Sequence, residues 1–463
     1  LGQRARGPPG LGGGEVIWFT TGLLFLVYLN APAVAVRIHG APFLVAALVP
    51  MMLAITVAHR VLLRGESLRL PRVIVAALVM LGLHAVSALA SERPMDAFDA
   101  LETWLLEGVV LALLIANAVR SRDDVRAAAV ALLAAGAVMG AVAVAQQVLG
   151  PDEYGFFGFG QHAAVVVDEG GRVARRLAGP IGETNRFAQI MAVLLPIGAG
   201  LSLSLQGRAR WACWLAMALI AAGMAFAFSR GAIVAIVLAI PVALAFRMLH
   251  LRQLIGVAIL GVVLLAAMPH YAERVASIGQ LAVRSLGLDP AGLRNADGAA
   301  RGRLTEMKAA GLLFLEHPML GAGPGLAPLY YGENASVVGG KVRAGTRRSH
   351  NLYLQLAAET GVVGLMAFLA VIFVSLRELD RARRRFEGSD RALWGLAAGL
   401  ELAIVISLTT SLFLHAAYIR YFWMLIGLAA ATSAQPGPPA LVAFLARALH
   451  ETADRLRTDE ARA

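Results

Sequence analysis

Residues 392–413 read ALWGLAAGLELAIVISLTTSLF, and the only charged residue among them is Glu401. A stretch of this length can cross the hydrocarbon core of a bilayer as a helix, which needs roughly 20 residues. Lipid offers the backbone no hydrogen-bond partners, so a crossing segment must satisfy its own backbone as a helix. We therefore predict a transmembrane helix here.

The whole chain has the same character. Of its 463 residues, 58% are hydrophobic and only 15% are charged, and the mean hydropathy is +0.69. Soluble domains carry roughly 25% charged residues, so the soluble, disordered and fibrous classes are excluded. We predict an all-α polytopic membrane protein of about 12 transmembrane helices. The expected crossings are residues 16–36, 42–60, 72–90, 101–119, 127–149, 186–206, 211–228, 231–249, 254–269, 351–375, 392–413 and 416–433.

The distribution of Lys and Arg predicts the orientation. Short loops on one side are rich in arginine, as in residues 60–72 and 377–391, and this side is predicted to be cytoplasmic. An even number of crossings places both termini there. Short loops on the other side hold only Arg37, Arg93, Arg230 and Arg420.

The organisation that follows has five parts. They are an N-terminal tail (1–15), a bundle of nine crossings (16–269), a periplasmic loop domain (270–350), three further crossings (351–433) and a cytoplasmic amphipathic tail (434–463). The two long outer segments, 150–186 and 270–350, are basic although topology does not require it, which predicts an anionic partner outside. Plain solubility of the loop is the alternative. The single cysteine, Cys213, excludes a disulfide framework.

The outer segment 299–364 carries the most chemistry. Its residues 301–314 are predicted to be helical, with Leu304 and Leu315 on a face that lies on the membrane or against the bundle, and Pro318 ends the helix. The run G-A-G-P-G at 321–325 resembles a nucleotide loop only superficially, because no strand precedes it and no Lys-Ser/Thr follows. A glycine turn is the preferred interpretation.

His350 lies where this polar segment enters the tenth crossing. We expect Ser349 to cap the helix and His350 to occupy its first turn. Arg347 and Arg348 precede it, and neighbouring cations disfavour an imidazolium, so the ring is expected to be neutral and able to accept a proton. The alternative is a polar anchor at the membrane interface.

Arginines occupy several other outer helix ends. Arg230 lies in the short turn S-R-G, Arg186 opens the sixth crossing after G-P-I-G-E-T-N, and Arg420 enters the last one. An arginine at such a place is costly unless it meets an anion or a carbonyl. These residues therefore predict an anion site, with snorkelling to lipid phosphates as the alternative.

Two acids lie within predicted crossings, Glu107 and Glu401. Buried carboxylates of this kind can mark a proton route, which keeps an ion-coupled transporter among the alternatives. Ligand spacings typical of a metal site are absent from the sequence, so no metal dependence is indicated.

The segments G-R-L-T-E-M-K (302–308), E-H-P-M-L-G-A-G-P-G (316–325) and H-N-L-Y-L-Q-L-A-A-E-T-G-V-V-G (350–364) together resemble the bacterial O-antigen ligase and O-antigen polymerase superfamily. The S-R-G turn and the G-E-T-N-R-F-A segment at 182–188 are similar to two further landmarks. With the crossing pattern, the resemblance covers most of the chain, and it is greatest to the ligases. One departure is Met307, where the family usually has Trp.

The resemblance implies a GT-C-like, metal-independent inverting glycosyltransferase of the bacterial inner membrane with its active site facing the periplasm. The donor would be a glycan on undecaprenyl pyrophosphate, and the acceptor of a ligase would be a sugar hydroxyl of lipid A core. A polymerase would instead join lipid-linked repeat units. Membrane lipids surround the protein, and neither a cofactor nor nucleic acid is expected as a partner. A flippase for lipid-linked oligosaccharide remains a further alternative.

We assign His350 as the general base, because removing the acceptor proton requires one. Paired guanidinium donors suit phosphate oxygens, so Arg303, Arg230 and Arg186 are assigned to the pyrophosphate. Residues with secondary roles are His317, Asn351, Arg301, Arg347 and Arg348.

Overall fold

The computed structural model describes residues 13–150, 155–167, 173–246, 298–339, 345–415 and 420–437. These residues are mostly helical, which confirms the predicted fold class. The predicted crossing at 254–269 lies outside the described residues, as does most of the tail at 434–463.

The N-terminal part of the chain is a series of helices, two of which continue as π-helical stretches. They are α1 (Gly13–Tyr28), α2 (Ala31–His39), α3 (Leu44–Ala58) with η1 (His59–Leu63), α4 (Arg72–Ala90), α5 (Pro94–Thr103) with η2 (Trp104–Val110) and α6 (Leu111–Ala118), and α7 (Arg122–Leu149).

After a 3-10 turn, η3 (Phe156–Gly158), and a β-hairpin, the chain returns to helices. They are α8 (Thr184–Ala192), α9 (Leu194–Ser202), α10 (Gly207–Phe226), α11 (Arg230–Ala245), α15 (Gly298–Glu316), α16 (Ala327–Val337), α17 (Leu352–Phe386), α18 (Arg391–Thr410) and α19 (Arg420–Ser433).

Six of the described helices are long and apolar enough to cross a membrane. A seventh crossing results if α1 and α2, which meet at 48°, form one bent span. Other expected crossings are built from shorter pieces: residues 101–119 combine the end of α5 with η2 and α6, and residues 186–206 divide into α8 and α9. The number of twelve therefore stays a prediction.

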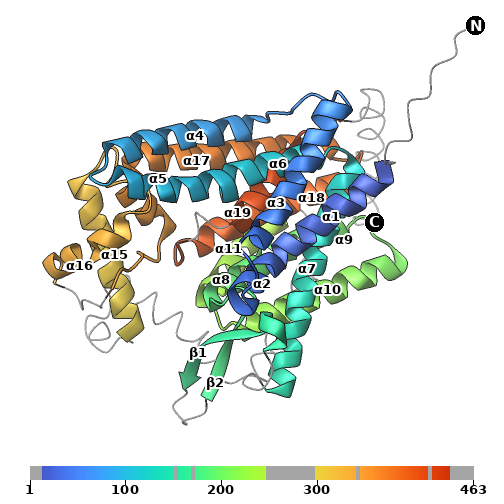
Figure 1. Cartoon of the computed structure of the whole chain (residues 1–463). Helices are drawn as coiled ribbons and strands as arrows, with labels where there is room; N and C mark the ends of the chain where they lie inside the picture. The colour runs from blue at the N-terminus through green and yellow to red at the C-terminus, as the bar shows by residue number, and fades with distance from the viewer. Residues whose placement is uncertain are drawn as a thin grey trace, which may run out of the picture.

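The hairpin was not predicted. Strands β1 (Gln161–Val167) and β2 (Val173–Gly179) pair antiparallel. Arg176 of β2 is buried, and its Nε donates to the Ala227 carbonyl at 2.9 Å while Nη2 donates to Asn185 Oδ1 at 2.8 Å. The hairpin is thus fastened to the first turn of α8 and to the segment between α10 and α11; Figure 1 shows the hairpin beside α8.

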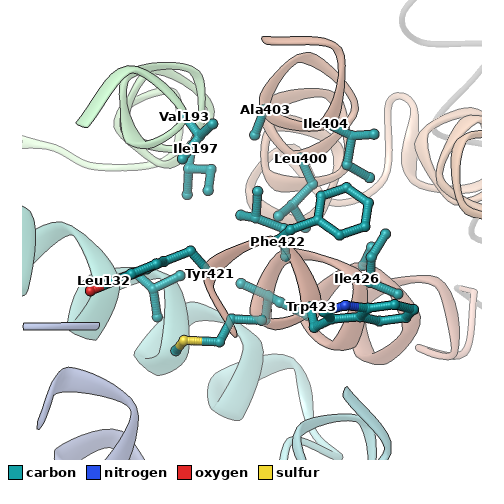
Figure 2. Close-up of a cluster of buried hydrophobic side chains, with 14 of the residues drawn as sticks. Leu132, Val193, Ile197, Leu400, Ala403, Ile404, Tyr421, Phe422, Trp423 and Ile426 are labelled. Carbon is teal, nitrogen blue, oxygen red and sulfur yellow. The ribbon is translucent and has the colours of Figure 1, made fainter. Parts of the chain in front are cut away.

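The core lies around α19. Every residue from Tyr421 to Thr432 is buried, as expected for a helix that is apolar on all sides. Figure 2 shows Phe422 of α19 beside Leu400 of α18, and Trp423 beside Ile426 of its own helix. The tight core supports the helix ends at which the polar residues gather.

We call one end of the bundle the site end: it carries the first residues of α8, α11, α17 and α19, together with α15 and α16. Figure 1 shows α15 and α16 beside the ends of α4, α5 and α17. At the opposite end, Arg383 of α17 pairs with the buried Glu401 of α18, with Nε and Oε2 3.2 Å apart.

Candidate functional site

The glycine run at residues 321–325 forms a turn whose backbone is hydrogen-bonded to α17. Gly321, Gly323 and Gly325 have φ angles of 71°, 117° and 75°, which side chains other than glycine rarely adopt. The nitrogens of Ala322 and Gly323 donate to the carbonyls of Ala358 and Glu359, both at 2.9 Å. The predicted glycine turn is therefore what the structure has, and it packs on α17.

The receiving surface exists because α17 is broken. Gly361 has φ 65° and ψ −171°, a conformation available essentially to glycine alone. The break frees the carbonyls of Ala358 and Glu359 from the helix, and the Val362 nitrogen donates to the Pro318 carbonyl at 2.9 Å instead. The docked loop thus holds the end of α15 against the first turns of α17, and α15 lines the site.

His350 forms a strained corner just before α17. Its φ is 45°, the left-handed region that is uncommon for residues with a side chain. Asn351 is the N-cap, since its Oδ1 accepts from the Leu354 nitrogen at 3.0 Å, while the Ser349 hydroxyl donates to the Asn351 carbonyl. The expectation that Ser349 caps the helix and His350 lies in its first turn is wrong: the left-handed turn gives the cap to Asn351.

A buried carboxylate faces this imidazole. Glu306 of α15 has a side chain only 1% exposed, and its Oε2 lies 3.7 Å from His350 Nε2. Arg347 and Arg348 are exposed to solvent, and the charge of Arg348 reaches His415. The ring of His350 thus has an acid beside it in addition to the expected cations, and its neutral state stays a prediction.

A second imidazole lies on the other side. The rings of His350 and His415 are 5.4 Å apart between centroids. Arg186 Nη2 lies 3.2 Å from His415 Nε2 and 3.4 Å from the His415 carbonyl oxygen. Burial first, then the charges of Arg186, Arg348 and His350, lower the pKa of His415 to about 3. His415, which lies between α18 and α19, is therefore neutral.

The segment 411–415 joins the elements of the site. The Ser411 carbonyl accepts from the Leu352 nitrogen at 2.9 Å, and the Leu412 carbonyl accepts from Asn351 Nδ2 at 3.2 Å. A Cβ added to Gly231 would lie 3.2 Å from Phe413, so the start of α11 is also in contact. This segment links the His350 corner to α8 and α11.

Two of the predicted phosphate ligands lie beside these contacts. Arg230 is the first residue of α11, next to Gly231, and is half-buried. Arg303 is half-buried on α15, one turn before Glu306, so both side chains project from the same face of the helix. Arg303 thus belongs to the helix that carries the Glu306 partner of His350, and Arg230 belongs to the helix whose start contacts Phe413, two residues before His415.

Of the remaining predicted site residues, some lie near the histidines and others do not. Arg348 is close enough for its charge to act on His415. His317 lies eleven residues beyond Glu306 at the far end of α15, about 17 Å along the helix, and does not join the cluster. Arg301 is part of α15, but its side chain lies outside the described residues.

Of the two positions expected for the leucine face of α15, on the membrane or against the bundle, the structure does not show the second. Leu304 and Leu315 are 42% and 72% exposed, whereas Ala309 and Leu313 are buried. The buried face also carries Glu306, at 2% exposure. Because the leucine face was the one expected to be covered, nothing in the sequence marked Glu306 as buried, and only the fold identifies it as a site residue.

His415 was missed for a different reason. It follows the apolar stretch S-L-F-L and shows no motif. Its contacts come from α8 and the His350 corner, which are distant in sequence, so only the fold reveals them.

Taken together, the site offers an imidazole beside a buried carboxylate and, a few ångströms away, a guanidinium held by a neutral ring. Such an arrangement can accept a proton from an alcohol at one point and stabilise an anion at the other.

Comparison with known proteins finds one family for part of this chain. Residues 215–369 match the family model described as O-Antigen ligase. The matched segment includes Arg230, Arg303, Glu306 and His350, whereas Arg186 and His415 lie outside it. A comparison with curated proteins gives no match.

Proposed function

From its place in the O-antigen ligase superfamily, whose members are membrane glycosyltransferases of the ligase or polymerase type, we propose that this protein transfers a glycan from undecaprenyl pyrophosphate to a sugar hydroxyl of lipid A core. The reaction takes place on the periplasmic side of the inner membrane, inverts the anomeric centre and needs no metal. The observation that carries the proposal is the His350 imidazole, set between the buried Glu306 carboxylate and the ring of His415, which in turn contacts Arg186.

His350 acts as the general base. The imidazole, whose Nε2 lies 3.7 Å from Glu306 Oε2, takes the proton as the acceptor oxygen bonds to the anomeric carbon. The Glu306 carboxylate stabilises the imidazolium that results and fixes the orientation of the ring, as a third group does in other base-assisted sites. The strained backbone at His350 supports this role, since strain of this kind is concentrated at functional sites.

The arginines stabilise the leaving group. As the bond between the anomeric carbon and the phosphate oxygen breaks, undecaprenyl pyrophosphate departs with the bonding electrons. Arg186, Arg230 and Arg303 offer forked donors that match phosphate oxygens, and their charge does the work for which other transferases use a divalent cation. Attack from the face opposite the pyrophosphate inverts the anomeric carbon.

The ligase is distinguished from a polymerase by the acceptor. We propose that purified protein given lipid-linked glycan together with lipid A core caps the core. Lengthening of the lipid-linked chains, with the core left unmodified, would instead identify a polymerase. No transfer to either acceptor would contradict both forms of the proposal.

The role of the arginines in binding the lipid-linked donor is tested by substitution. Arg230→Gln and Arg303→Gln should each raise the KM for the lipid-linked donor about tenfold or more, because a hydrogen-bonded charge pair is lost, with little change in the KM for the acceptor. Arg208→Gln, an exposed arginine of α10, serves as the control. Unchanged donor KM in both site variants would show that these arginines only anchor helices.

A further inference from the structure

His415 connects the two halves of the proposed site. We propose that His415 is a positioning residue, a permanently neutral imidazole that holds Arg186 so that one side of its guanidinium is presented to the diphosphate. The inference rests on the proposed function and deepens it, since it names how one phosphate ligand is oriented.

The direction of the hydrogen bond defines the state of the ring. Arginine can only donate, so His415 Nε2, 3.2 Å from Arg186 Nη2, must be the acceptor. The ring proton therefore lies on Nδ1. If His415 were protonated, its Nε2 would carry a hydrogen that faces the N–H of Arg186. Two donors cannot form a hydrogen bond, so the bond between Arg186 and His415 would be lost.

The surroundings maintain that state. Burial and the positive charges of Arg186 and Arg348 lower the pKa of His415 to about 3, so the ring stays uncharged wherever a periplasmic enzyme works. A neutral ring adds no charge beside His350, 5.4 Å away, when that imidazole takes up a proton. A lysine or arginine at this position would repel both.

The hydrogen bonds of the Arg186 guanidinium are made by one nitrogen only, within the part of the chain that the structure describes. Nη2 lies within hydrogen-bond distance of His415 Nε2 and of the His415 carbonyl oxygen, whereas Nε is 3.2 Å from Glu183 Oε2 in an ion pair and makes no hydrogen bond there. Among the described residues, no hydrogen bond to Nη1 is present, so this nitrogen has two donors for a ligand. Arg186 also lies in the first turn of α8, where free backbone N–H groups favour anions.

His415 is itself fixed in place. Segment 411–415 accepts hydrogen bonds from Leu352 and from the Asn351 side chain, and Gln189 of α8 donates to Thr410 Oγ1 at 2.7 Å. The ring therefore keeps both Arg186 and the His350 corner at constant distances.

Three substitutions separate the roles of the ring. His415→Gln keeps an uncharged acceptor near the Nε2 position, His415→Leu keeps the volume without an acceptor, and His415→Lys adds a charge. His39→Leu is the control, since His39 is an exposed imidazole whose Nε2 lies 2.9 Å from the Phe157 carbonyl. The full-length protein in detergent is titrated calorimetrically with inorganic pyrophosphate, and donor KM and kcat are measured in the transfer assay.

We expect His415→Leu to weaken pyrophosphate binding and to raise donor KM by roughly tenfold or more, the loss typical of a hydrogen bond to a charged group, with kcat changed much less. His415→Gln should stay within about threefold of wild type, and His415→Lys should bind more weakly than either. A His415→Leu protein that binds pyrophosphate like wild type, or a His415→Gln protein as impaired as His415→Leu, would overturn the inference. If wild type transfers nothing but the binding order holds, the proposed function fails and the positioning role stands.

Discussion

The carboxylate of Glu306 and the imidazole of His350 are 3.7 Å apart, and they come from residues 44 positions apart in sequence. The sequence identified His350 through its place at a helix start after a glycine run. It did not identify the acid, because a lone Glu in the helical stretch 302–308 resembles an ordinary surface charge. At the scale of single residues, chemistry was predictable from type and position, whereas partners required the fold.

The role of Glu306 can be measured at this scale. Glu306→Gln keeps the size of the side chain but removes the charge that stabilises the imidazolium, so kcat should fall roughly 100-fold. Initial rates at saturating donor and acceptor report the change. Glu316→Gln, an exposed acid of the same helix, is the control. A rate within twofold of wild type for Glu306→Gln would remove the carboxylate from the mechanism.

Among the elements, α17 departs most from its predicted form. The predicted crossing at 351–375 looks continuous, since a single glycine inside an apolar helical pattern is often tolerated. The break at Gly361 arises because the loop of residues 317–325 supplies the hydrogen bonds that the interrupted helix lacks. The extent of α15 and its end before Pro318 followed from local signals and are confirmed. The β-hairpin and the division of α8 from α9 depend on tertiary contacts and were not predicted.

The break in α17 predicts that replacing Gly361 lowers the stability of the protein. In Gly361→Ala the new Cβ would collide with the Met319 carbonyl and the backbone would leave its favoured region, which should cost at least about 1–2 kcal/mol of stability. Because the docked loop holds α15 against α17, transfer should fall together with the thermal midpoint. Gly332→Ala, on an open face of α16, is the matched control and should be neutral or slightly stabilising. Equal midpoints for the two variants would show that the break is not structurally required.

Across the whole molecule, the two acids of the predicted crossings have structural partners. Glu401 pairs with Arg383 at the end opposite the site, and Glu107 Oε2 lies 3.8 Å from Arg420 Nε. A transporter would use such acids as a proton route near the middle of the membrane. Ion pairing gives both acids a structural role and favours chemistry at the site end. Composition sufficed to predict the membrane class, whereas pairing of the acids required the fold.

This view predicts that the acids are dispensable for transfer. In Glu107→Gln/Glu401→Gln the loss of the buried Glu401 carboxylate leaves Arg383 paired with Asp380 alone, so thermal stability should fall. Transfer per folded molecule should be within about threefold of wild type and should not respond to an imposed proton gradient. Abolished transfer in a folded double variant would restore the ion-coupled alternative.

The central claim is that His350 activates the acceptor alcohol while arginines hold the diphosphate, without a metal. The most direct measurement is the initial rate of glycan transfer by purified wild-type and His350→Ala protein in buffer containing EDTA, with inorganic pyrophosphate binding measured on the same samples. We predict that wild type stays active in EDTA, that His350→Ala loses about 10² to 10⁴ in rate, and that both bind pyrophosphate. Near-normal transfer by His350→Ala, or complete loss of wild-type activity in EDTA, would contradict the claim.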